Sequence, residues 1–182
     1  RILEKDDMAW DAFQLANRAM FMQRVQLAIQ REYPASYPDK KDLSKALNDI
    51  DYGTADETFS KDRYAWRPFQ LAFMLLDVAS VTDDDSADRS LVDLIWFPTG
   101  GGKTEAYLGL TAMTIFYRRF RHPAQGGGTT VIMRYTLRLL AAQQFARAST
   151  LICACEFIRK DCESKKSRYR RYALGTTPIT IG

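Results

Sequence analysis

Three consecutive glycines followed by lysine and threonine, in the stretch PTGGGKT at residues 98–104, constrain the fold of this chain more than any other feature. An apolar run rich in strand formers, residues 91–97, precedes them, and a stretch with helical patterning, residues 103–120, follows. A glycine-rich loop between a strand and a helix is the pattern of a phosphate-binding loop. Glycines let successive backbone N–H groups turn toward one point, and the start of the helix adds partial positive charge. The pattern therefore predicts a site for nucleotide phosphates.

The elements after the loop alternate in the same way. Residues 129–135 and 177–181 are short and rich in β-branched side chains, and residues 137–160 have the pattern of a long helix. A β-α-β-α-β order with buried strands predicts an α/β fold, in which a parallel sheet has helices on both faces.

The first third of the chain has a different character. Residues 8–30 lack Gly and Pro and repeat apolar side chains near helical spacing, which predicts a long amphipathic helix. A second helix is predicted to begin at Pro68, because proline is compatible with the first helical position. Residues 33–60, between the two, are loop-rich. We therefore divide the chain into an α-helical N-terminal segment, residues 1–60, and a unit that carries the phosphate loop, residues 61–182.

Charge is distributed unevenly along the chain. Residues 1–90 hold 12 Lys+Arg against 17 Asp+Glu, a net of −5, and residues 91–182 hold 14 against 5, a net of +9, which together give the overall +4. This asymmetry indicates that the second half faces a polyanion, although a solvated basic surface has the same composition. The basic tract KKSRYRRY, residues 165–172, has two interpretations as well: a contact for a nucleic-acid backbone, or a solvated loop.

The remaining composition points to the cytoplasm. The sequence has no run of about 18 apolar residues, so we expect no transmembrane helix and no membrane partner. The start of the chain has no apolar signal region. Cys153, Cys155 and Cys162 lack the spacing of a zinc site, so we interpret them as reduced thiols, partly buried in a helix.

Roles within the phosphate loop follow from its chemistry. Lys103 is expected to bridge the β- and γ-phosphates and the Thr104 hydroxyl to ligate Mg²⁺, which makes them the candidate catalytic residues, with ATP and Mg²⁺ as cofactors. The remaining nucleotide-binding candidates of the loop are Thr99, Gly100, Gly101 and Gly102. Phe97 stands where the pattern has a smaller residue. Glu105 either tunes Thr104 or is a first-turn acid favoured by the helix dipole, and we favour the dipole.

The loop PTGGGKT resembles motif I of the superfamily 2 helicases. Upstream, RPFQ at residues 67–70 resembles the segment that reads adenine in these helicases, so the resemblance implies nucleotide-binding roles for Arg67 and Gln70. An amide side chain suits the adenine edge because it carries both a donor and an acceptor. Trp66 or Phe69 is the candidate stacking surface. The alternative is that Gln70 lies on a helix surface and that the aromatic side chains are buried.

Downstream, MRYTLRLLAAQQ at residues 133–144 resembles motif Ia, which contacts the sugar-phosphate backbone of the bound strand in these helicases. The resemblance implies nucleic-acid contacts for Thr136, Arg138 and Gln143. Tyr135 replaces the usual proline and the spacing to the glutamine is one residue longer. An ordinary amphipathic helix start is the alternative.

The longer string from about Arg67 to Gly182 resembles the helicase subunit of the DISARM anti-phage defence system. This resemblance implies a RecA-like motor lobe in a bacterial cytoplasmic ATPase that acts on DNA. It also implies a DrmB-like partner subunit, which contains a domain of unknown function, and a DNA methyltransferase in the same system.

Part of the expected catalytic machinery is not visible in the sequence. The acids after Glu105 are Glu156, Asp161 and Glu163, and none belongs to the Asp-Glu pair that such motors use to hold Mg²⁺ and orient water. We expect that pair and the arginine finger, which contributes on the order of 10³ to 10⁵ in rate, to lie outside this chain. The chain alone is therefore expected to be inactive. A non-catalytic nucleic-acid-binding scaffold with a vestigial loop is the alternative function, and another phosphate-loop enzyme, such as a kinase, is a third.

Overall fold

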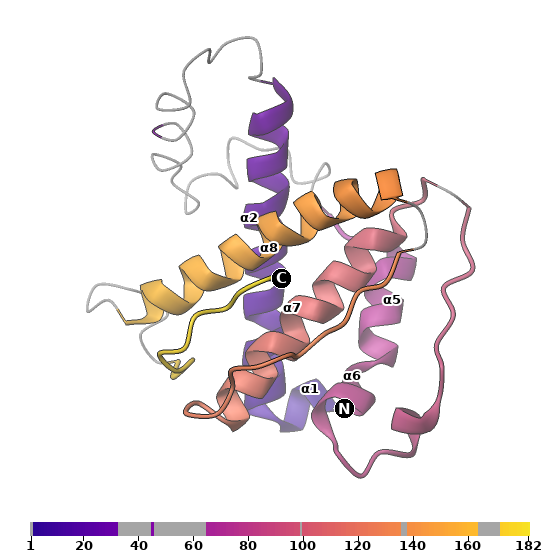
Figure 1. Ribbon diagram of the computed structural model, residues 1–182. Coiled ribbons are helices and arrows are strands. Elements are labelled where there is room, and N and C mark those ends of the chain that lie inside the picture. The colour runs from indigo at the N-terminus through magenta and orange to yellow at the C-terminus, as the bar shows by residue number, and fades with distance from the viewer. Residues whose placement is uncertain (1, 33–44, 46–64, 99, 136–137, 164–171) are drawn as a thin grey trace.

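The computed structural model describes residues 2–32, 45, 65–98, 100–135, 138–163 and 172–182 (Figure 1). Its helices are α1 (Ile2–Lys5), α2 (Asp7–Glu32), α5 (Pro68–Leu76), α6 (Val78–Thr82), α7 (Lys103–Arg121) and α8 (Arg138–Cys162), with a 3₁₀ turn, η2 (Ala87–Ser90). The predicted long helices and the helix start at Pro68 are confirmed, each within two residues at either end. The helix α2 packs against both α7 and α8, and α5 packs along α7.

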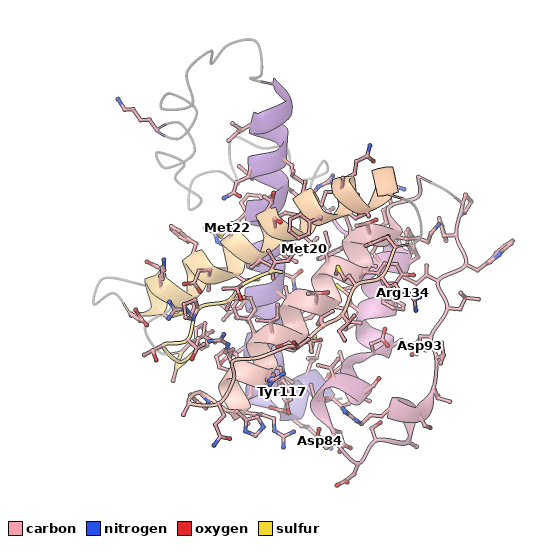
Figure 2. All side chains as sticks on the ribbon, in the orientation of Figure 1. Met20, Met22, Asp84, Asp93, Tyr117 and Arg134 are labelled. Atoms are coloured by element: carbon pink, nitrogen blue, oxygen red, sulfur yellow. The ribbon has the colours of Figure 1, made fainter. Side chains whose placement is uncertain are left out.

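Small side chains allow α2 to approach its neighbours closely. Ala9, Ala12, Ala16 and Ala19 recur at helical spacing and are completely buried. Bulkier members of the same core come from α7 and α8, such as Phe116 and Leu151. Met20 and Met22 lie where α2 and α8 cross (Figure 2), and both are buried. The N-terminal helix and the helices that follow the phosphate loop thus share one hydrophobic core.

The predicted α/β class is wrong for the part of the chain that the structure describes, because the described residues form helices and irregular segments and no strand. Residues 91–97, 129–135 and 177–181, which we expected to be buried strands, form no sheet. Val92 is 96% exposed and Trp96 is 89% exposed, so the first of these segments does not contribute its apolar run to the core. A strand is stable only when neighbouring strands pair its backbone groups, and local sequence does not supply that pairing.

Arginines at the end of α7 hold two of these segments in place of strand pairing. The Arg118 guanidinium donates to the carbonyl oxygens of Gly127, at 2.9 Å, and Thr129, at 2.8 Å. The buried Arg119 donates to the carbonyls of Leu174 and Pro178, each at 3.2 Å, and also to that of Thr177. Carbonyl groups that a sheet would have paired are therefore satisfied by side chains.

A second set of contacts fixes the end of the molecule that contains α6. The Tyr117 hydroxyl donates to the carbonyl oxygen of Thr82, at 2.8 Å, and lies 3.2 Å from Asp6 Oδ2 (Figure 2). Burial and the nearby Asp6 carboxylate raise the pKa of Tyr117 to about 12, so the hydroxyl keeps its proton. Arg121 pairs with Asp84 at 2.8 Å, which joins the run of three aspartates at residues 83–85 to the basic end of α7.

Two further predictions can be compared with the described residues. All three cysteines are free thiols, with Cys155 and Cys162 buried in α8 and Cys153 exposed, as expected for unpaired thiols in a helix. Among the residues that the structure describes, no helix has the length and apolar character needed to cross a membrane.

Candidate nucleotide site

Two of the three glycines before α7 have a left-handed backbone, and the N–H of Gly101 between them donates to the carbonyl oxygen of Pro98, at 3.1 Å. Gly100 has φ of +81° and Gly102, the N-cap of α7, has φ of +90°, whereas φ is not positive at Gly101. Alternation of left-handed and ordinary residues turns successive N–H groups toward one side of the chain. The N–H groups of the first helical turn have no partner within the helix, so they add donors at the same place.

The segment that was predicted to read adenine touches this loop. The Gln70 side-chain amide donates to the carbonyl oxygen of Gly102, at 2.7 Å, and Arg67 donates to the carbonyl of Gly101, at 2.7 Å. Gln70 Oε1 accepts the backbone N–H of Arg67, at 2.9 Å, which caps the start of α5. Gln70 is buried, and its amide retains one N–H and one lone pair beyond these contacts. The structure therefore brings together the two segments that sequence placed in one site.

Two stacked aromatic side chains pack beside the glycine loop. The rings of Phe69 and Phe97 stack with centroids 4.0 Å apart and an interplanar angle of 14°. A Cβ atom on Gly101 would lie 2.8 Å from the Phe97 ring, so the large residue at 97 requires a glycine at 101. Trp66 turns inward instead, and its indole N–H donates to Asn17 of α2. Of the two stacking candidates, Phe69 is thus the one that lies beside the loop.

Lys103 lies over the loop in this conformation. Its Nζ donates to the carbonyl oxygens of Phe97, at 2.5 Å, and Pro98, at 3.2 Å. Thr104 follows in the first turn of α7 and is partly exposed, and Thr99 lies outside the described residues. The ammonium group is therefore held by exposed, uncharged carbonyl oxygens at the start of the loop.

Glu105 has partners that the sequence did not suggest. Its Oε1 accepts from Arg24 of α2, at 3.2 Å, and also from Arg147 of α8. The Glu105 side chain is 13% exposed, whereas both arginine side chains are more exposed, so these ion pairs are partly buried. The dipole explanation alone does not account for this acid, because it links three helices immediately after the phosphate loop.

The predicted nucleic-acid segment is described only in part. Thr136 and the Arg138 side chain lie outside the described residues, although Arg138 is the first residue of α8. Gln143 lies in the second turn of α8 and its side chain is exposed. From the basic tract at 165–172 only Tyr172 is described, and its hydroxyl contacts Asp11 at 3.0 Å.

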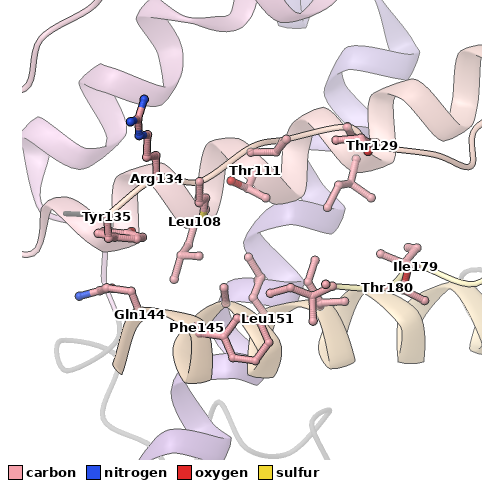
Figure 3. Close-up of a pocket in the computed structure, with 18 of the residues that line it drawn as sticks. Leu108, Thr111, Thr129, Arg134, Tyr135, Gln144, Phe145, Leu151, Ile179 and Thr180 are labelled. Atoms are coloured by element: carbon pink, nitrogen blue, oxygen red, sulfur yellow. The ribbon is translucent and has the colours of Figure 1, made fainter. Parts of the chain in front are cut away.

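A cavity of about 910 Å³ lies apart from the loop, between α7, α8 and the segments at 128–135 and 178–182 (Figure 3). Its lining mixes polar and apolar residues, with Leu108, Phe145, Leu151 and Ile179 among the apolar side chains that face it. The buried Arg119 guanidinium at its wall is already bonded to carbonyl groups, so it is not available to a ligand. The described residues that were predicted to bind nucleotide do not line this cavity.

Comparison with known proteins finds similarity to a curated bacterial protein. No family model matches the chain. It is 43% identical over 134 residues to a protein of Bacillus paralicheniformis named "DISARM protein DrmA", a match that covers 71% of this chain. The chain is DrmA-like. It spans 11% of the length of that DrmA protein.

The DrmA-like sequence contains a signal for the ion pairs that our sequence analysis missed. Acids are sparse after residue 91, and the two that are most buried, Glu105 and Glu156, each contact arginines. Glu156 contacts Arg159 at 2.8 Å, and this partner holds the pKa of the carboxyl below its usual range. A lone acid in a basic half is thus an indicator of a buried pair. Arg24 carried no such signal, because its distance in sequence conceals the contact.

Proposed function

We propose that this chain is the nucleotide-binding part of an ATP-dependent, DNA-acting protein of a DISARM anti-phage defence system. The observation that carries the proposal is the pair of 2.7 Å hydrogen bonds from Arg67 and Gln70 to the carbonyls of Gly101 and Gly102. These contacts join a glycine loop suited to phosphates with a segment suited to an adenine base. The identity to DrmA supports the assignment to a defence system.

In this proposal the described side chains act in the following way. Lys103 leaves the carbonyls of Phe97 and Pro98 and binds the β- and γ-phosphates, since a doubly charged phosphate is a stronger acceptor than two exposed carbonyls. Thr104 offers its hydroxyl as a ligand for Mg²⁺, which neutralises phosphate charge when bound. Gln70 uses its remaining N–H and lone pair to distinguish adenine from guanine.

DNA binding is assigned to the start of α8. Arg138 and the exposed Gln143 belong to its first two turns, where backbone amides and the helix dipole favour an anion. Contacts of this kind neutralise phosphates and hold the strand without reading its sequence. We further propose that a partner subunit of the same defence system, DrmB-like, assembles with the whole protein.

ATP hydrolysis by the full-length protein tests the proposal, measured with and without single-stranded DNA. Lys103→Ala is expected to lower kcat/KM for ATP by about 100-fold or more. Lys160→Ala is the matched control, because this exposed lysine lies in the last turn of α8, 3.8 Å from Glu156. Equal rates for wild type and Lys103→Ala contradict the motor proposal. DNA binding without any ATP hydrolysis by the wild type favours the scaffold alternative.

A further inference from the structure

We propose that the Glu105–Arg147 ion pair transmits nucleotide occupancy from the phosphate loop to the DNA-contacting part of α8. The inference rests on the proposed function and adds to it a route between the two sites. It assigns positioning roles to both residues, since neither is placed in contact with a ligand.

The nucleotide end of this route begins at Glu105, which follows Thr104 in the first turn of α7. A Cβ atom at Gly102 would lie 3.4 Å from Glu105 Oε2 and 2.7 Å from the Gln70 amide, so the carboxylate borders the loop itself. Its other oxygen, Oε1, holds both arginines. A shift of the loop around a bound phosphate would therefore displace the Glu105 carboxylate, which is paired with Arg147.

The DNA end of the route is the helix α8. Arg147 lies four residues after Gln143, one turn further along the helix, so the two side chains neighbour each other on the helix surface. Because α8 is continuous from Arg138 to Cys162, a displacement at Arg147 moves the helix start with it. Coupling between sites requires such a packed, rigid element whose position both ligands influence.

The helix α2 supplies the fixed support for this pair. Its fully buried Gln23 donates to the backbone carbonyl of Arg147, at 3.0 Å, and the next residue, Arg24, donates to Glu105. The Arg24 side chain is 40% exposed, whereas the Arg147 side chain is 25% exposed, so the Glu105–Arg147 ion pair is the more buried of the two. Removal of Arg24 leaves Glu105 paired with Arg147, which makes it the matched control.

Thermodynamic linkage provides the test. The dissociation constant of a fluorescent single-stranded oligonucleotide is measured for the full-length protein, with and without a non-hydrolysable ATP analogue. In wild type the analogue is expected to change this constant by about tenfold, within the usual range for coupled sites. Arg147→Met and Glu105→Gln are expected to bring the ratio close to one, while Arg24→Met retains most of the change. Binding of the fluorescent analogue itself is recorded for every variant, with the melting temperature as a check on folding.

Each outcome separates the two proposals. Failure of wild type to bind the analogue contradicts the proposed function. Analogue binding with a wild-type ratio near one overturns the coupling alone, as does a wild-type-like ratio in Glu105→Gln, which preserves side-chain size. An equal loss of coupling in Arg24→Met and Arg147→Met also overturns the inference, because the cluster then acts as a general brace and not as a route to α8.

Discussion

The side-chain amide of Gln70 hydrogen-bonds to the backbone carbonyl of Gly102 at 2.7 Å, across 32 positions of sequence. The start of α5 and the start of α7 therefore determine each other's positions. A residue expected to read a base thus also fixes the loop expected to hold the phosphates, so changes at Gln70 should affect both properties.

Gln70→Glu is expected to weaken ATP binding and to destabilise the loop. The substitution keeps the size of the side chain but places a carboxylate oxygen against the Gly102 carbonyl, and loss of a buried donor costs about 1–3 kcal/mol. The measurement is the dissociation constant for ATP and for GTP. Gln14→Glu, on an exposed surface of α2, is the control and should leave ATP affinity unchanged. No preference for ATP over GTP in wild type would contradict the adenine role.

Gly102→Ala is expected to be more damaging than Gly100→Ala. Both glycines have positive φ, which costs a non-glycine residue about 1–2 kcal/mol. A Cβ atom at Gly102 would also lie 2.7 Å from the Gln70 amide, whereas nothing lies within 4 Å of one at Gly100. Urea unfolding and ATP affinity measure the difference, and equal effects would show that backbone strain alone sets the requirement for glycine.

Arg119→Met is expected to loosen the segment at 172–182 and to lower the free energy of unfolding by about 3 kcal/mol. The methionine removes a buried guanidinium and leaves the carbonyl of the buried Leu174 without its donor, as well as that of the exposed Pro178. An unsatisfied buried group costs about 1–3 kcal/mol. Arg121→Met, two positions later, removes only an exposed pair with Asp84 and should have little effect. Urea unfolding monitored by circular dichroism gives both values. Similar losses in the two variants would be inconsistent with this account.

Stability should depend on pH through Asp77. Burial and the neighbouring Asp93 raise its pKa from 3.8 to about 6, so the folded state holds this proton more tightly than the unfolded chain. The contribution is therefore fully favourable below about pH 4 and is lost as pH rises through 6. Asp77→Asn should gain stability relative to wild type as pH rises above 4, by on the order of 2 kcal/mol at pH 7. Urea unfolding at several pH values measures this difference, and a constant difference across the range would be evidence against it.

Sequence patterns predicted the helices well because their signals are local. Pro68 starts α5 as expected, and the glycine loop leads directly into α7. The same approach failed for residues 91–97, since a run such as Leu91 to Phe97 indicates an extended chain but not what pairs with it. The sheet was inferred from an order of elements, and the order does not itself create a partner for each strand.

The same contrast between local and long-range signals applies to the residues of the candidate site. Gln70 and the glycines were found from short motifs, and their proximity is seen in the structure. Arg24 and Arg147 were not found, because they lie 81 and 42 positions from Glu105 in the sequence. Contacts between such distant residues leave no periodic pattern in a single sequence. The nucleotide, metal and DNA roles of the site residues remain predictions.

The four buried alanines of α2 determine which segments of this protein can be exchanged in chimeras. Ala9, Ala12, Ala16 and Ala19 place α2 in the same core as α7 and α8, which lie beyond the division at residue 60. A chimera that exchanges only residues 61–182 between relatives would join helices whose contact surfaces did not evolve together. Donor sequences for such exchanges should therefore include α2, and random transposon insertions within it should be as harmful as insertions beside the glycine loop.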